Sequence, residues 1–284
     1  MGFSVNTNLA ALNTFRNLTT TQTAQAKSLE KLSSGLRINR AADDAAGLSI
    51  AEGLKAQVNG YNVAQRNAQD GISVIQVAEG AYAEAQAILQ RMRDLAVQGA
   101  NDTNSGDARA AIQAELNELT AELGRIASST NFNGTQLLGA GEDGAAVTDL
   151  SIQVGADGAA DNAITIDLTT ANLDSILSDL DAATNVLVGD HDEAQGAITA
   201  LDAAIDAVSD VRSKLGATQN RLEYASTVAA VAAENLAAAE SRIRDVDMAK
   251  EMMEFNRTNI LSQAGIAMLA QANASNQGVL QLLR

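Results

Sequence analysis

The sequence predicts a mainly α fold, a long antiparallel coiled-coil bundle of helices with a small β-hairpin region, in which the N- and C-terminal helices pair. Proline is absent from the 284 residues, and proline inside a long helix costs about 3 kcal/mol. Aromatic residues are only 2% of the chain, so its apolar surface comes from Ala, Leu, Val and Ile, which suit closely packed helices. Apolar residues recur at helical spacing over long stretches, and one central stretch alternates instead.

The N-terminal arm, residues 1–42, carries a weak helical pattern. Val5, Leu9 and Leu12 are spaced four and three, but the stretch TTTQTAQAKS that follows is polar and rich in Thr. Such a stretch forms a poor helix when isolated. A break is predicted around RINRAADDAAG, with Asp43 and Asp44 in the first turn of the next helix, where the helix dipole favours acidic groups.

Two stronger helices are predicted at about 44–99 and 108–128. Spacings of four and three alternate through both, the period of a helix wound on another helix. Gly99 is placed to end the first helix, and Asp107 is placed to cap the second. The residues NFNG at 131–134 predict a turn after the second helix.

The centre of the chain predicts a β-hairpin at about 148–170. Apolar and polar residues alternate in LSIQV and again in ITIDL, and GADGAADN between them is rich in Gly and Asp. Helical spacing returns at about 193–240. These helices and the hairpin together form the predicted shell domain, residues 43–240.

Within the C-terminal arm, residues 241–284, the stretch 260–283 is apolar on too many sides for a helix free in water. Met248, Met252 and Met253 are expected to pack within helices. Ordering a residue costs about 1–2 kcal/mol, so arms with so little buried area should fold only when other copies supply apolar surface. If a patch on one copy meets a different patch on the next, an open polymer results. The residues predicted to make these contacts are Val5, Leu9, Leu12, Ile260, Ala264, Leu269, Leu280 and Leu283.

Charge and composition exclude several classes of protein. The net charge is −16, and no Lys or Arg lies between Arg125 and Arg212, which argues against binding nucleic acid. No apolar run is long enough for a membrane span. His191 is the only histidine and cysteine is absent, so we expect no catalytic site, no metal site and no cofactor. HDE at 191–193 predicts a polar loop.

Several blocks of sequence closely resemble the bacterial flagellins. They occur in order at both ends of the chain: SLEKLSSGLRINRAADDAAGLSIAEGL (28–54), QRMRDLAVQGAND (90–102), NFNGTQLL (131–138), RSKLGATQNRLEYA (212–225), SRIRDVDMAKE (241–251) and NILSQAGIAMLAQAN (259–273). The resemblance implies a secreted structural subunit that polymerises with other copies into the flagellar filament for swimming motility. It also implies that the paired arms form an inner coiled coil lining the channel of the filament.

The resemblance also implies partners and a location. They are the flagellar export apparatus and its chaperone, the filament cap and the hook-associated proteins, with the subunit ending outside the cell. Flagellins are exported without a cleavable signal peptide, and MGFSVNTNLAALNTF has no basic leader or cleavage site. About 15–25 residues separate Leu173 from the returning helix, so we expect a minimal flagellin without large outer domains and a smooth, thin filament.

One further surface follows from the resemblance alone. In related flagellins the segment matching QRMRDLAVQ, with a Glu on the neighbouring helix, lies between protofilaments, and the vertebrate Toll-like receptor for flagellin binds there. The matching positions are Arg91, Leu95 and Glu115, with Asp94 in place of the commoner Glu. From periodicity alone, Leu95 is a residue of the helix seam and Arg91 a solvated charge.

Two other functions remain open at this stage. A hook–filament junction protein shares the paired ends but forms a short ring. A secreted coiled-coil binding protein would be a stable monomer with ordered ends. An enzyme is disfavoured because no catalytic constellation is present in the sequence.

Overall fold

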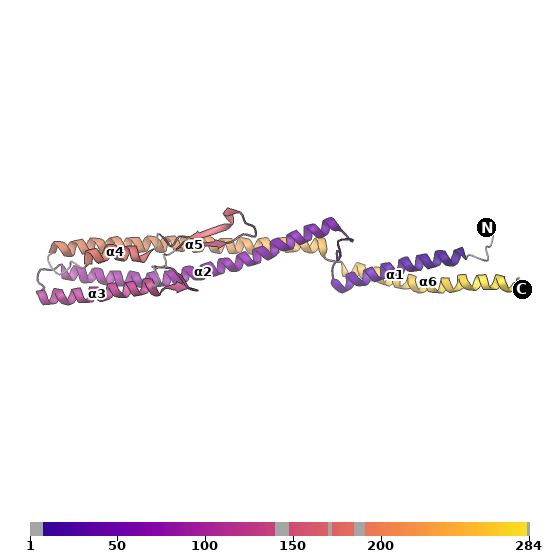
Figure 1. Ribbon diagram of the computed structural model, residues 1–284, viewed down its shortest axis with the longest axis horizontal. Coiled ribbons are helices and arrows are strands. Elements are labelled where there is room, and N and C mark those ends of the chain that lie inside the picture. Colours follow the sequence, from indigo (N-terminus) through magenta and orange to yellow (C-terminus); the bar gives the residue numbers. More distant parts are fainter. Residues whose placement is uncertain (1–7, 140–147, 170–171, 185–190, 283–284) are drawn as a thin grey trace. The chain divides into compact units, whose positions relative to one another are not determined.

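The computed structural model confirms the mainly α fold (Figure 1). It describes residues 8–139, 148–169, 172–184 and 191–282. The elements are α1 (Leu9–Ser34), α2 (Ala45–Gly99), α3 (Gly106–Ser129), β1 (Asn131–Phe132), β2 (Thr135–Gln136), β3 (Leu150–Gln153), η1 (Ala160–Asn162), β4 (Ala163–Ile166), α4 (Leu173–Thr184), α5 (His191–Arg244) and α6 (Met248–Leu282). Two compact units result: a terminal unit of residues 1–56 and 234–284, and a middle unit of residues 57–233.

In the terminal unit, α1 and α6 lie side by side and antiparallel (Figure 1). Near one end of the pair, Asn8 Nδ2 donates to Ala272 O at 3.0 Å. Asn8 also caps α1, because its side chain accepts from Ala11 N. Gly35 ends α1 with a φ of 73°, the left-handed conformation that glycine adopts at little cost.

The two connections of the terminal unit are hydrogen-bonded to each other. Leu36 and Asp245 form an isolated antiparallel bridge, with Arg37 N donating to Arg244 O at 2.6 Å and Val246 N to Gly35 O at 3.0 Å. Because the same short bridge joins the end of α1 to the start of α6, the two arms are anchored at one place.

Two helix starts differ from the sequence prediction. Asp43 and Asp44 precede α2 rather than lying in its first turn: Asp44 accepts from Gly47 N at 2.9 Å, as a capping residue does. Backbone N–H groups of Arg40 and Asn39 donate to Asp43 and lower the pKa of its carboxyl. The contribution of these hydrogen bonds to stability is present above the ordinary pKa of the Asp43 carboxyl. It is lost as pH falls through the lowered pKa that this carboxyl has in the folded chain. At α3, Ser105 is the cap and Asp107 lies in the first turn.

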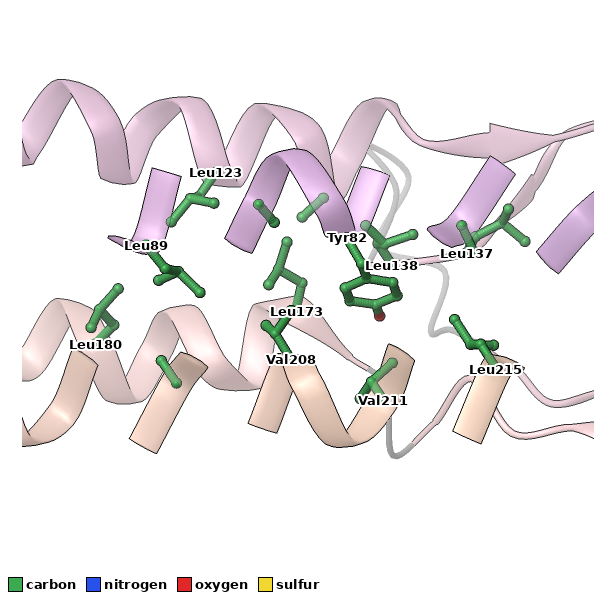
Figure 2. Packing of buried hydrophobic residues seen from close by; sticks show 14 of the residues in the cluster. Tyr82, Leu89, Leu123, Leu137, Leu138, Leu173, Leu180, Val208, Val211 and Leu215 are labelled. Atoms are coloured by element: carbon green, nitrogen blue, oxygen red, sulfur yellow. The ribbon is translucent and has the colours of Figure 1, made fainter. Parts of the chain in front are cut away.

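In the middle unit, α2 and α5 run antiparallel. Arg93 of α2 pairs with Asp202 of α5, whereas Glu79, earlier on α2, pairs with Arg212, later on α5. Leucine, alanine and valine side chains from α2, α3, α4 and α5 fill the core between them (Figure 2). Tyr82 is fully buried there, and burial raises the pKa of its hydroxyl.

The predicted hairpin is present as β3 and β4, paired antiparallel from Leu150 opposite Ile166 to Gln153 opposite Ala163. It lies close against α2, because Asn67 Nδ2 donates to Gln153 O at 3.1 Å. NFNG forms more than a turn: β1 and β2 pair across Asn133 and Gly134, whose φ values of 52° and 82° fit a two-residue hairpin turn.

Helix α4 corrects the sequence prediction, which has only a connection between the hairpin and the helix near 193. Leu173, Ile176, Leu177 and Leu180 have helical spacing and face the core. Asn172 Oδ1 accepts from Asp174 N at the helix start, and Leu173 N donates to Leu138 O at 2.7 Å. The apolar spacing is therefore a signal for helix α4 in the sequence, but the signal is weak because the helix has only 12 residues.

Candidate assembly surface

The seam between α1 and α6 is small and polar. Among the side chains of this helix pair that the structure describes, those of Leu18, Ser28, Thr258 and Ser262 are buried. The Thr258 hydroxyl bonds within its own helix, donating to Glu254 O at 3.0 Å. Gly265 admits Leu18, since a Cβ at this glycine would lie 3.2 Å from Leu18 Cδ1. A seam of this kind brings two backbones close together but buries little apolar area.

The large apolar side chains of the two helices face outward instead. Leu9, Phe15 and Ile260 are 68%, 59% and 67% exposed. We call this set the arm surface; it comprises Leu9, Leu12, Phe15, Leu29, Met248, Met252, Met253, Ile260, Leu261, Ile266 and Met268, each exposed. A pair of helices that buries Ser28, Thr258 and Ser262 while its leucines are exposed has the usual pattern reversed. Exposed apolar surface of this extent marks an interaction site.

The middle unit shows the ordinary arrangement. Leu89, Leu116, Leu123 and Leu201 are fully buried in one continuous core. Among the described residues, the exposed Leu, Phe and Met side chains all lie on the arms, whereas α2 and α5 expose Ile50, several valines and Tyr224. The sequence of the arms explains part of this: Leu9 and Leu12 lie outside the heptad frame that Leu18 and Ser28 follow toward α6.

The residues predicted for the polymer contacts are distributed as follows. Leu9, Leu12, Ile260 and Ala264 are exposed, and Leu269 is half-buried. Leu280 belongs to α6, but its side chain is outside what the structure describes; Val5 and Leu283 are outside the described residues altogether.

Sequence reasoning missed some members of this surface and misjudged others. Phe15 was not singled out, although it lies three residues after Leu12 at helical spacing. Met248, Met252 and Met253 were expected to pack within helices, and they are 49%, 49% and 67% exposed. The α6 backbone turns them away from the seam occupied by Thr258 and Ser262.

A second candidate surface was predicted at Arg91, Leu95 and Glu115. The structure brings Arg91 and Glu115 together. The guanidinium of Arg91 on α2 lies 2.6 Å from Glu115 Oε1 on α3, and both side chains are about half exposed to solvent. An exposed pair of this kind contributes only about 0–1 kcal/mol to stability, which leaves both charges available to a partner.

Leu95 belongs to a different environment. Its side chain is 2% exposed and packs in the core of the middle unit. It is a seam residue, as its heptad position indicates, and it cannot touch a partner while the core is closed. Removing it would weaken the core rather than a surface contact.

No site for chemistry is apparent in the part of the chain that the structure describes. Within residues 8–139, 148–169, 172–184 and 191–282, no three His, Asp or Glu side chains gather closely enough for a metal ion. The open groove between α3 and α4, lined by Asn117, Thr120, Asp174 and Ser178, presents hydroxyl and amide groups with a carboxylate. None of the described helices has the length and apolarity that crossing a membrane requires.

Comparisons with known proteins agree with these observations. Residues 5–142 match the bacterial flagellin N-terminal helical region, and residues 198–283 match the bacterial flagellin C-terminal helical region. A flagellin of Halalkalibacterium halodurans is 53% identical over 280 residues, covering 99% of each chain. The flagellar filament 33 kDa core protein of Treponema phagedenis is 46% identical over 285 residues, again covering 99% of each chain.

A solved structure gives a likeness of fold alone. The structure of a putative flagellar hook-associated protein from Vibrio parahaemolyticus has a TM-score of 0.58, with 14% sequence identity over 72% of this chain and 100% of that one. At this level of identity the likeness concerns the fold of the matched part alone.

Proposed function

Because this chain belongs to the bacterial flagellin family and is a structural subunit of the extracellular flagellar filament, we propose that its arm surface joins each copy to its neighbours. The observation that carries the proposal is the outward placement of the large apolar residues on α1 and α6. The occupant of that surface is a second copy of the chain, since copies of this subunit meet in the filament.

The energetics favour burial by neighbours. Burying a Leu, Ile or Phe side chain contributes roughly 1.5–3 kcal/mol relative to leaving it in water. The eleven Leu, Ile, Phe and Met residues of the arm surface on each copy therefore outweigh the loss of freedom of motion on assembly, which costs about 4–15 kcal/mol. Contacts between unlike patches repeat without closing and give an open helical polymer.

The arms gain most of their order on assembly. A seam of Leu18, Ser28, Thr258 and Ser262 buries too little apolar area to offset the entropy of ordering the two helices. The arms, residues 1–42 and 241–284, are then an assembly domain that gains most of its stability from other copies. The shell, residues 43–240, carries its own core and folds before assembly.

The exposed Arg91 and Glu115 supply a second contact. Their ion pair on the surface of α2 and α3 supports a charged contact between protofilaments. The vertebrate Toll-like receptor for flagellin is a further partner for these two charges on the free subunit. Leu95 acts there only by holding α2 in place.

Export and placement complete the proposal. An extracellular filament subunit needs a route out of the cell, and we assign that route to the flagellar export apparatus with a chaperone that covers the arm surface. The filament cap and hook-associated proteins then receive the subunit. The described residues of the middle unit, which spans 57–233, form no compact unit beyond it, and this supports a smooth, thin filament.

Growth from seeds tests the function. Purified monomer, added to short sheared filament seeds, should extend them into filaments many times longer than the seeds, as seen by electron microscopy. A junction protein of the hook type would stop as a short ring, and a coiled-coil binding protein would stay single. Either result would overturn the proposal.

A further inference from the structure

The sulfur of this chain is carried by methionine alone, and most of it lies on one helix. The sequence has six Met and no Cys. Four of the six, Met248, Met252, Met253 and Met268, are on α6 and are 49%, 49%, 67% and 61% exposed. Met92, in contrast, is fully buried in the middle unit.

We propose that these four thioethers are a modification site, at which oxidants of the peroxide class convert methionine to sulfoxide and so block assembly of the subunit. The inference rests on the proposed function, because it takes α6 to be buried between copies. It adds a reversible oxidation of methionine, by which assembly of the subunit is controlled.

The exposure of each sulfur decides where oxidation occurs. Oxidation of methionine follows access to the sulfur, so the α6 methionines of a free subunit should react while Met92 is shielded. With no thiol in the chain to compete for oxidant, the thioethers on α6 are the most accessible sulfur in the described residues.

The reaction balances with the oxidant named. A lone pair on the thioether sulfur attacks one oxygen of hydrogen peroxide, and an S–O bond forms as the O–O bond breaks. The other oxygen leaves as hydroxide and takes the proton of the transferred oxygen, which gives the sulfoxide and water. Sulfur is oxidised by two electrons and the peroxide is reduced by the same two. A methionine sulfoxide reductase, with a dithiol as reductant, reverses the change.

The sulfoxide changes what the arm surface can contact. The apolar, flexible thioether becomes a polar group with a strong acceptor oxygen. Met252 and Met253 lie within the first two turns of α6, and Met268 lies two residues after Ile266. The new oxygens would therefore stand among the apolar members of the arm surface. An acceptor buried there without a donor opposes assembly.

Assembly should in turn protect the site. Once a neighbouring copy covers α6, peroxide has no access to the four sulfurs, so the filament resists an oxidant that disables the free subunit. Damage is thereby confined to subunits not yet incorporated.

The test compares oxidised and untreated subunits on the same seeds. Wild-type monomer is treated with hydrogen peroxide, freed of oxidant and added to untreated seeds. The critical concentration for growth should rise by at least about tenfold. Treatment with methionine sulfoxide reductase should restore it.

Two variants locate the effect. A chain with Met248→Leu, Met252→Leu, Met253→Leu and Met268→Leu keeps an apolar arm surface. Whatever its critical concentration without treatment, peroxide should leave that value unchanged. Met92→Leu is the matched control, and it should stay as sensitive as wild type. Equal sensitivity of the four-leucine chain, or normal growth of oxidised wild type, would overturn the proposal.

A second measurement stands even if the four-leucine chain fails to assemble. Mass spectrometry of wild type, residue by residue, should show the four α6 sulfoxides forming in monomer at least about tenfold faster than in filament. Equal rates would contradict the inference. Failure of the proposed function looks different, since untreated wild type would then not extend seeds at all.

Discussion

Replacing Ile260 by aspartate abolishes filament growth while leaving the middle unit folded. Ile260 is 67% exposed and belongs to the terminal unit, so the free chain loses no buried contact. In the polymer the same position is buried by a neighbour, where an unpaired carboxylate costs several kcal/mol in each copy. Seeded growth followed by sedimentation measures the loss, and circular dichroism during heating measures the monomer.

Two substitutions at the same position act as controls. Ile260→Leu keeps an apolar side chain of the same volume and should grow normally. Ile260→Asn is close in size to aspartate but neutral, and it should fall between the two. Growth of Ile260→Asp at the wild-type critical concentration would mean that this face of α6 stays in water in the filament.

Truncating Leu89 to alanine destabilises the middle unit by about 2–5 kcal/mol. Leu89 is fully buried between α2 and the facing helices (Figure 2), and a cavity remains when its branched end is removed. For a unit of this size the melting temperature should fall by roughly 4–20 °C. Differential scanning calorimetry of the monomer measures both quantities.

Val97→Ala is the matched control for that substitution. Val97 lies on the same helix but is 48% exposed, so its truncation should change stability by no more than about 0.5 kcal/mol. Equal melting of the two variants would show that the core does not form around Leu89.

The helices of the middle unit could be predicted closely from sequence because their core has one repeating frame. α2 ends at Gly99, as its spacing and its glycine indicate, and α5 begins close to the predicted 193. Capping is harder to predict. Asp43, Asp44, Ser105 and Asp107 can all cap a helix, and only the backbone geometry selects Asp44 and Ser105.

The orientation of the arms could not be derived in the same way. α1 has apolar residues in more than one heptad frame, and both Leu12 and Leu18 fit a helical spacing. The close approach of Leu18 to Gly265 decides the frame, and this contact joins residues far apart in sequence. Spacing within one arm carries no information about the other.

The residues Arg91, Leu95 and Glu115 differ in which feature of the sequence predicts their position. Periodicity placed Leu95 in the helix seam, where the structure has it, whereas resemblance to relatives suggested a surface role for it. Arg91 and Glu115 could be paired only by resemblance, because no local pattern connects positions 24 residues apart on two helices.

Hydrogen exchange of the backbone amides of α1 and α6, measured on free subunits and on filaments of the same chain, tests the central claim most directly. If order in the arms comes from neighbouring copies, these amides exchange rapidly in the dilute monomer and become strongly protected in the filament, while those of α2 around Leu89 are protected in both. Equal, strong protection of α1 and α6 in the lone subunit would contradict the account.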